Sequence, residues 1–167
     1  SFAHIYNPIL ALKVLQQLLA SYPNAQLSMV GPFKDDSIEA CKACAAQHQL
    51  PVTFTGGMPK ADWLKYAQDF DIFINTTNVD NTPVSVIEAM ALGLPIVTTN
   101  VGGIPYLLEH QKEALLVPPD NVPAMTQAIT SLLENPEKTR SLSQTGRQKV
   151  KKFDWEVVKG KWVEVLK

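Results

Sequence analysis

The sequence predicts an α/β fold, with a Rossmann-like parallel sheet, helices on both faces of the sheet and extra helices at the C-terminal end. Short apolar segments alternate along the chain with segments whose apolar residues recur at helical spacing. The apolar segments lack the strict alternation of a half-exposed strand, which is typical of a parallel sheet covered on both sides. After residue 117 only helical patterns follow.

The first part of the chain alternates helices with two glycine-bounded strands. Pro8 suits the first position of the first helix, with Asn7 as its N-cap. Gly31-Pro32 ends the first strand, and Gly56-Gly57 ends the second. The elements predicted here are helices over residues 8–19, 36–49 and 61–68 and strands over residues 26–30 and 51–55.

The second part begins with the segment FDIFIN, which has the character of the most buried strand. Thr82 is predicted to cap the next helix, with Pro83 at its first position. Gly102-Gly103 marks a loop. The elements predicted here are strands over residues 70–75, 95–99 and 114–117, helices over 84–92, 122–134, 136–153 and 155–166, and a helical turn over 105–109.

Composition limits the function classes. Hydrophobic residues make up 46% of the 167 residues and charged residues 19%, which indicates one globular domain and argues against disorder. The net charge of −1 provides no basic field for nucleic acid. No apolar run is long enough to span a membrane, and no signal peptide is recognisable, so we expect a cytoplasmic protein. Residues 1–8 contain no clear first strand, and we expect a domain over residues 1–167 that is truncated at its N-terminal edge.

Cys41 and Cys44 form a C-x-x-C pair. A zinc site needs about four ligands, and the sequence has no second pair of cysteines. The two cysteines also fall in the middle of a predicted helix, whereas a redox pair normally opens one. We therefore expect two structural thiols, at least one of them buried.

The loops after the predicted strands are the places to look for a ligand site, because parallel sheets bind ligands at the carboxyl ends of their strands. Residues 76–83 form such a loop and are mostly polar. The N–H groups of Val84 and Ser85 would then be free at a helix start, where phosphate binds well. Taken alone, this feature is better explained by an ordinary capped helix.

Glu88 adds a second observation. It lies in an otherwise apolar helical segment, where a carboxylate needs solvent, a partner or a ligand. Two vicinal ribose hydroxyls would satisfy both of its oxygens. Asp80 precedes the same helix, so two acidic groups flank a set of free backbone donors. This layout suits the sugar, diphosphate and ribose of a nucleotide sugar.

The segment from Asp80 to Thr99 resembles a family motif. Asp80-(x)7-Glu88 and the run EAMALGLPIVTT that begins at Glu88 are similar to the E-(x)7-E motif of the retaining GT-B glycosyltransferases of group 1. Further segments resemble that family in order, from about residue 7 to residue 134: LSMVGP, VTFTG, YAQDFDIFI, VGGIP and LLVPPD. The resemblance implies the nucleotide-sugar-binding, C-terminal half of a GT-B transferase.

The resemblance also implies roles for individual residues. Asp80 would be the catalytic residue that holds hydroxyls of the transferred sugar, and Glu88 would bind the ribose. Residues that would bind the rest of the donor, largely through backbone groups, are Asn81, Thr82, Pro83, Val84 and Ser85 at the helix start, Thr55, Gly56 and Met58 at the nucleobase, and Gly31, Gly102 and Gly103. No metal is implied, since fixed cationic and amide groups usually replace one in this family.

The sequence departs from the family pattern at several positions. Asp80 is one methylene shorter than the usual Glu, and Tyr106 stands where many members have Glu. The family's diphosphate-clamping Arg and Lys lie near the end of its first strand, where this chain reads AHIYNP, so that Arg would lie just before Ser1. None of the three histidines is expected to be catalytic.

The expected function is transfer of a hexosyl group from a nucleotide sugar to an acceptor, with retention of configuration, as in polysaccharide biosynthesis. The partner would be an absent N-terminal acceptor domain of the same protein, which could also attach it to a membrane surface. We expect residues 1–167 alone to be inactive. Two alternatives are a non-catalytic module that binds nucleotide sugars and a GT-B sugar-nucleotide epimerase.

Overall fold

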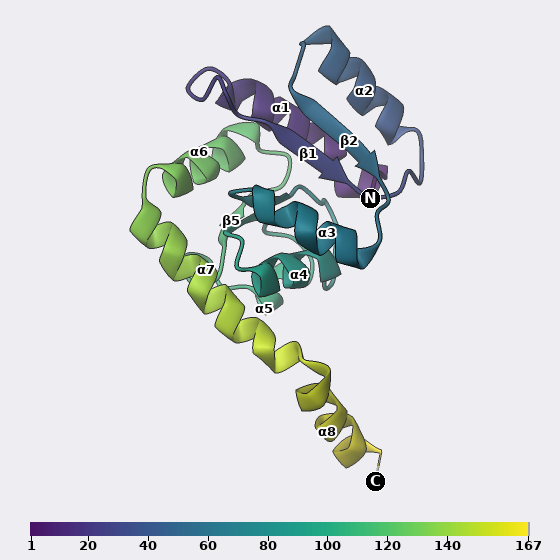
Figure 1. Cartoon of the computed structure of the whole chain (residues 1–167), viewed down its shortest axis with the longest axis vertical. Coiled ribbons are helices and arrows are strands. Elements are labelled where there is room, and N and C mark those ends of the chain that lie inside the picture. The colour runs from purple at the N-terminus through teal and green to yellow at the C-terminus, as the bar shows by residue number, and fades with distance from the viewer. Residues whose placement is uncertain (167) are drawn as a thin grey trace.

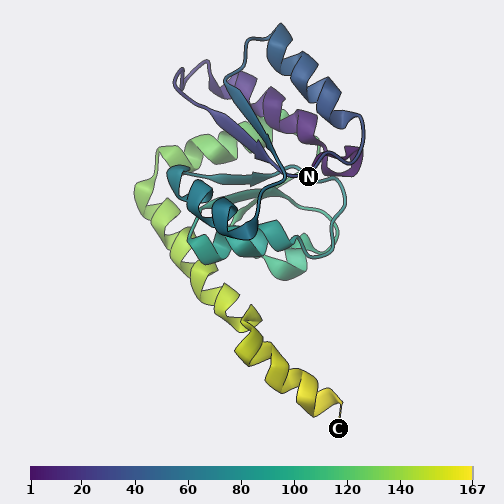
Figure 2. The same cartoon turned by 45° about the vertical axis from the view of Figure 1, so that its right-hand side comes forward.

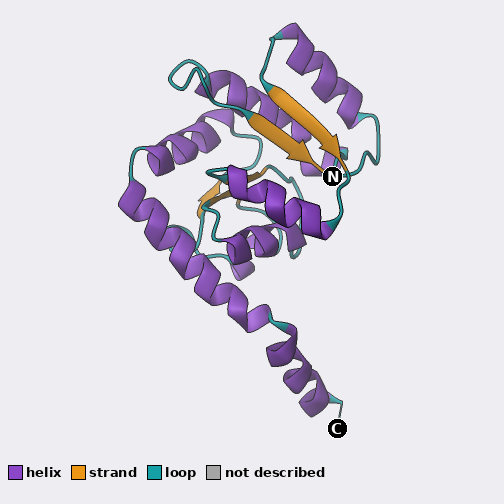
Figure 3. Ribbon diagram, in the orientation of Figure 1, coloured by secondary structure: helices purple, strands orange, loops and turns teal. Residues whose placement is uncertain are grey.

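The structure is a computed structural model that describes residues 1–166, apart from the side chain of Lys161. In this part of the chain, strands and helices alternate up to residue 117 and helices follow (Figure 1, Figure 3). The strands are β1 (Leu27–Val30), β2 (Val52–Gly56), β3 (Phe73–Asn75), β4 (Ile96–Thr99) and β5 (Leu115–Val117). The α-helices are α1 (Pro8–Leu18), α2 (Ser37–Gln47), α3 (Lys60–Tyr66), α4 (Val84–Leu92), α5 (Ile104–Leu107), α6 (Val122–Leu133), α7 (Pro136–Val150) and α8 (Trp155–Val165). Short 3-10 helices are η1 (His4–Tyr6), η2 (Ala67–Asp69) and η3 (Lys151–Phe153).

All strand pairs are parallel, as predicted, but the strands form two sheets and not one. The first sheet pairs β1 with β2, and the second has the order β3-β4-β5. Helices α1 and α2 pack on the first sheet through Leu12, Leu15 and Cys41, among others. The Rossmann-like architecture is therefore present, with a break between β1 and β3.

The second sheet is covered on both faces. Its β4 strand is completely buried, and its two apolar side chains belong to two different clusters because successive residues of a strand point to opposite faces. Val97 packs toward α1, α6 and α7, whereas Ile96 packs toward α4 and α5. Helix α1 serves both sheets, since it contributes Leu12 to the cluster under β1 and Val14 to the cluster under β4.

The segment FDIFIN differs from the prediction. Only Phe73–Asn75 forms a strand, and all three residues are half-buried, whereas β4 is the buried strand. The reason is that β3 pairs with β4 on one edge only. Its other edge faces a large cavity.

The C-terminal helices form an extension. Helix α7 packs against α4 and α6, and α8 projects beyond the body of the domain (Figure 2). Several apolar side chains of α8 are exposed, including Trp155 and Val165. Within residues 1–166, no helix is both long and apolar enough for a membrane span.

The prediction for the two cysteines is confirmed. Both lie on α2 as free thiols, with Cys41 fully buried and Cys44 half-buried. Burial, with a smaller contribution from the neighbouring Cys44, raises the pKa of the Cys41 thiol to about 11. Cys41 is therefore protonated at neutral pH and suited to packing, not to redox or metal chemistry.

Candidate functional site

The candidate site lies where the loops after β1, β2 and β3 meet at the carboxyl ends of the parallel strands. One cavity, of about 1160 Å³, brings together part of the predicted set. The predicted residues that line it are Gly31, Met58, Asp80, Thr82, Pro83, Val84 and Ser85. Asn81, Glu88, Thr55, Gly56, Gly102 and Gly103 do not line it.

The start of helix α4 carries the free backbone donors that the sequence suggested. The N–H groups of Val84 and Ser85 form no hydrogen bond with any described residue, and both residues are exposed. The predicted cap is wrong, however. Pro83, not Thr82, is the N-cap, because its carbonyl accepts from the amides of Val86 and Ile87 while its backbone stays extended. No side chain in the described part of the chain caps the helix, so its first donors remain available.

The loop that carries Asp80 is fixed by buried threonines. The Thr77 hydroxyl donates to the carbonyl of Val79, and the Thr99 hydroxyl donates to the carbonyl of Thr77 at 2.6 Å. The Thr76 hydroxyl donates to the carbonyl of Tyr6. These bonds connect the loop to β4 and to η1, so that Asp80 is held beside the start of α4 through the backbone.

The backbone of Gly102 and Gly103 packs directly against the backbone of this loop. The amide of Gly103 donates to the carbonyl of Asp80 at 2.8 Å. A Cβ atom on Gly103 would lie 1.9 Å from the carbonyl oxygen of Asn81, and one on Gly102 would lie 2.1 Å from that of Asp80. The two glycines therefore allow close packing of two backbone segments, and their relation to the cavity is indirect.

Gly103→Ala should lower the melting temperature, because the loop at Asn81 must move to admit the methyl group. A forced backbone shift costs about 1–3 kcal/mol, equivalent to roughly 2–10 °C for a domain of this size. Gly160→Ala is the matched control, because a Cβ atom there meets no atom of the described residues within 4 Å. Thermal unfolding of both variants checks this; equal melting temperatures would contradict the packing role of Gly103.

Glu88 already has two protein partners. Trp63 donates its indole N–H to Oε2 at 2.9 Å, and the Nζ atom of Lys60 lies 3.0 Å from Oε1. The Glu88 side chain is 21% exposed and that of Lys60 is 71% exposed. Each carboxylate oxygen retains a second lone pair, so these contacts leave room for ligand hydroxyls. No pattern in the sequence pointed to Trp63 or Lys60, because both come from another helix, α3.

Asn75 and Thr98 are polar residues that the sequence reasoning missed. They face one another across β3 and β4. Asn75 also lines the cavity. Its Nδ2 atom and the Thr98 hydroxyl are buried without a hydrogen-bond partner among the described residues. Their position inside apolar strands concealed them, and their unsatisfied atoms are the signal that only a structure supplies.

Two other acidic groups, Asp69 and Asp71, lie away from the carboxyl ends of the strands. They form an Asp-x-Asp tripeptide, a metal-binding pattern in other proteins. They precede β3 and line the opposite, amino end of the same cavity. Among the described residues, His4, Asp35 and Asp36 lie close enough to share an ion. The hydrogen bond to Asp36 and the charge of Asp35 raise the pKa of the exposed His4.

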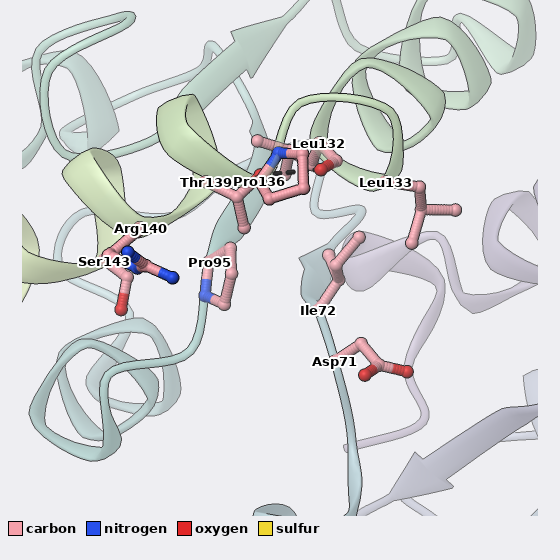
Figure 4. Close-up of a pocket in the computed structure, with 9 residues that line it drawn as sticks. All are labelled: Asp71, Ile72, Pro95, Leu132, Leu133, Pro136, Thr139, Arg140 and Ser143. Carbon is pink, nitrogen blue, oxygen red and sulfur yellow. Dashed lines mark hydrogen bonds between the residues drawn. The ribbon is translucent and has the colours of Figure 1, made fainter.

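A second, smaller pocket, of about 310 Å³, lies at the same amino edge (Figure 4). It is lined by Asp71 and Ile72, which precede β3, by Pro95 and by the ends of α6 and α7 that meet there. Arg140, the first arginine of the chain, contributes to it. Arg140 is therefore on the wrong edge of the sheet to contact a donor held near Asp80.

The sequence and the fold of this chain were compared with those of known proteins, and a family model, sequence relatives and solved structures match it. A family model described as glycosyl transferases group 1 matches residues 1–149. An uncharacterized glycosyltransferase of Haemophilus influenzae is 29% identical over 93% of this chain and 44% of its own length. Sucrose-phosphate synthase from Thermosynechococcus elongatus superposes with a TM-score of 0.82 and 26% identity, over 93% of this chain and 41% of that one. Anabaena Alr3699/HepE in complex with UDP-glucose superposes with a TM-score of 0.91 and 20% identity, over 99% of this chain and 46% of that one. The chain thus spans less than half the length of each of these proteins.

Proposed function

Because this chain belongs to the glycosyl transferases group 1 family, we propose that it is the donor-binding domain of a transferase that moves a hexosyl group from a nucleotide sugar to an acceptor with retention of configuration. The remainder of the protein would supply the acceptor site. Residues 1–167 alone would bind the donor and leave it unreacted, since proximity to an acceptor is missing.

The convergence of three loops in one cavity carries this proposal. Asp80, from the loop after β3, lies with the free amides of α4 and with Met58, from the loop after β2. A donor sugar would lie against Asp80, its diphosphate against the α4 amides, and its base against the segment around Met58. Glu88, one turn further along α4, would take the ribose hydroxyls.

The chemistry follows from the charge that develops on the diphosphate. In front-face attack the acceptor oxygen bonds to the anomeric carbon on the side from which the nucleoside diphosphate leaves. Negative charge accumulates on the departing phosphate. The amides of Val84 and Ser85 are fixed donors at the positive end of a helix and would stabilise that charge without reorganisation. We propose that they act with a basic residue outside residues 1–167, and without a metal.

A non-catalytic binding module is the second candidate. The short side chain of Asp80 and the existing partners of Glu88 favour it, since both could reflect a site that binds without turnover. An epimerase is the third, and the family match favours it less. Sugar transfer by the full-length protein distinguishes the first candidate from the other two.

Titration calorimetry with UDP, GDP and ADP and their glucose or mannose conjugates tests the donor site. We expect one nucleotide class to bind the chain. Val84→Pro removes one free backbone amide and should weaken the binding of that nucleotide. Glu39→Gln, on α2 and outside the lining of the cavity, is the control and should bind normally. UDP-glucose is the first conjugate to try, since Anabaena HepE is known in complex with it. Absence of binding for every nucleotide would contradict the proposal.

A further inference from the structure

The two carboxylate oxygens of Glu88 are held in different ways. Oε2 accepts from the indole N–H of Trp63, a half-buried side chain that packs beside Phe73. Oε1 lies 3.0 Å from the Nζ atom of Lys60, an exposed side chain at the first position of α3. One oxygen is therefore fixed by a packed aromatic residue, and the other is paired with a cation that solvent and ligands can reach.

The ion pair between Lys60 and Glu88 contributes little to holding α3 in place. Solvent screens the charge of an exposed lysine, and the long side chain loses rotamer freedom when it pairs. The indole bond and the ring contact of Trp63 already connect α3 to α4 and β3. The Lys60 ammonium has three donors, and Glu88 is its only ion-pair partner among the described residues. Its other donors can therefore serve a ligand.

The pair lies where the ribose of a bound nucleotide would be. Glu88 follows Val84 by one turn on the same face of α4, and the free amide of Val84 would hold the diphosphate. Lys60 follows Met58, which lines the cavity at the proposed position of the base, by two residues. Figure 1 shows α3 beside α4. Neither Lys60 nor Glu88 lines the cavity itself, but each lies directly beyond residues that do, as the ribose lies between base and diphosphate.

A sugar hydroxyl both donates and accepts a hydrogen bond, whereas an ionised carboxylate only accepts and an ammonium only donates. A hydroxyl that donates to the second lone pair of Oε1 would come within reach of Nζ, because Nζ lies 3.0 Å from the same oxygen. Lys60 and Glu88 together can thus satisfy both functions of one hydroxyl. The Oε2 side offers no such combination, since the single N–H of Trp63 already donates to Glu88.

We propose that Lys60 is a specificity-determining residue of the donor site, which donates to the ribose hydroxyl that is held by Oε1 of Glu88. A site that holds a ligand hydroxyl with both a donor and an acceptor rejects the analogue without it, because both groups then lose a partner. The pair would therefore distinguish ribonucleotides from deoxynucleotides. This inference rests on the proposed function, since it requires a nucleotide in the site.

Calorimetry on the full-length protein with UDP, 2′-deoxy-UDP and 3′-deoxy-UDP tests the inference, with the guanosine or adenosine set where that nucleotide binds instead. We expect each deoxy analogue to bind wild type about tenfold or more weakly than UDP does. Lys60→Met, which removes the ammonium, should reduce this penalty to about threefold or less for one analogue and leave it unchanged for the other. Lys60→Arg, which keeps a charged donor, should retain both penalties. Lys112→Met breaks a similar exposed ion pair with Glu109 and is the control, also with both penalties retained.

Unchanged penalties for both analogues in Lys60→Met would overturn the inference and leave the proposed function intact. An equal decrease of both penalties would also overturn it, because Lys60 would then act by orienting Glu88 and not by contact with one hydroxyl. Absence of binding by UDP, GDP and ADP to the wild-type protein would contradict the proposed function itself, and this inference with it.

Discussion

Asp80→Ala in the full-length protein should lower the rate of sugar transfer by about a hundredfold or more, while the dissociation constant for free nucleoside diphosphate stays nearly unchanged. A positioned group that acts mainly in the transition state affects turnover and not ground-state binding. This variant is expected to change the side chain without changing the loop backbone. The Asp80 backbone is held by the amide of Gly103, so removal of the side chain leaves the loop in place.

Transfer of radiolabelled sugar and calorimetry with nucleoside diphosphate provide the two measurements. Glu39→Ala is the control, because it removes an exposed carboxylate of α2 that does not line the cavity, and it should affect neither. Asp80→Glu tests whether the pocket tolerates a longer side chain. Retained activity would show that it admits the family's usual residue. Full transfer activity in Asp80→Ala would refute the assignment of Asp80.

Much of the fold could be predicted from the sequence because its signals are local. Glycine and proline mark the ends of β1 and β2, and helical spacing identifies α1 without reference to the rest of the chain. The burial of FDIFIN was predicted wrongly because burial depends on neighbours. An apolar segment pairs on two edges only if two strands flank it, and β3 has one such neighbour.

The candidate site also combines features that could be predicted from the sequence with features that depend on residues distant in the chain. The loop after β3 and the free donors of α4 follow from sequence order, because carboxyl ends of parallel strands share an edge. Glu88, a half-buried carboxylate in an apolar helical segment, needs partners, but the sequence does not identify them. Trp63 and Lys60, distant in sequence, supply them. Gly103 was assigned to the cavity, whereas its tight contact is with the Asp80–Asn81 backbone.

Glu88→Gln should weaken nucleoside diphosphate binding by about tenfold, because a charge-assisted bond to the ribose, worth about 1.5–3 kcal/mol, becomes a neutral one of about 1 kcal/mol. The amide oxygen of glutamine still accepts from Trp63, so the connection between α3 and α4 should persist. Calorimetry measures the effect. Glu39→Gln, which removes a similar ion pair with Lys42 on α2, is the control and should bind as wild type does.

Trp63→Phe separates direct binding from an indirect, structural effect. It removes the indole donor to Glu88 but keeps an aromatic ring beside Phe73, whose centroid lies 6.4 Å away. If Glu88 contacts the ribose itself, Trp63→Phe should change the dissociation constant by less than about threefold, and the double variant should resemble Glu88→Gln. If Trp63→Phe weakens binding as much as Glu88→Gln, Glu88 acts by holding α3 in place. The ribose must then be bound by other residues.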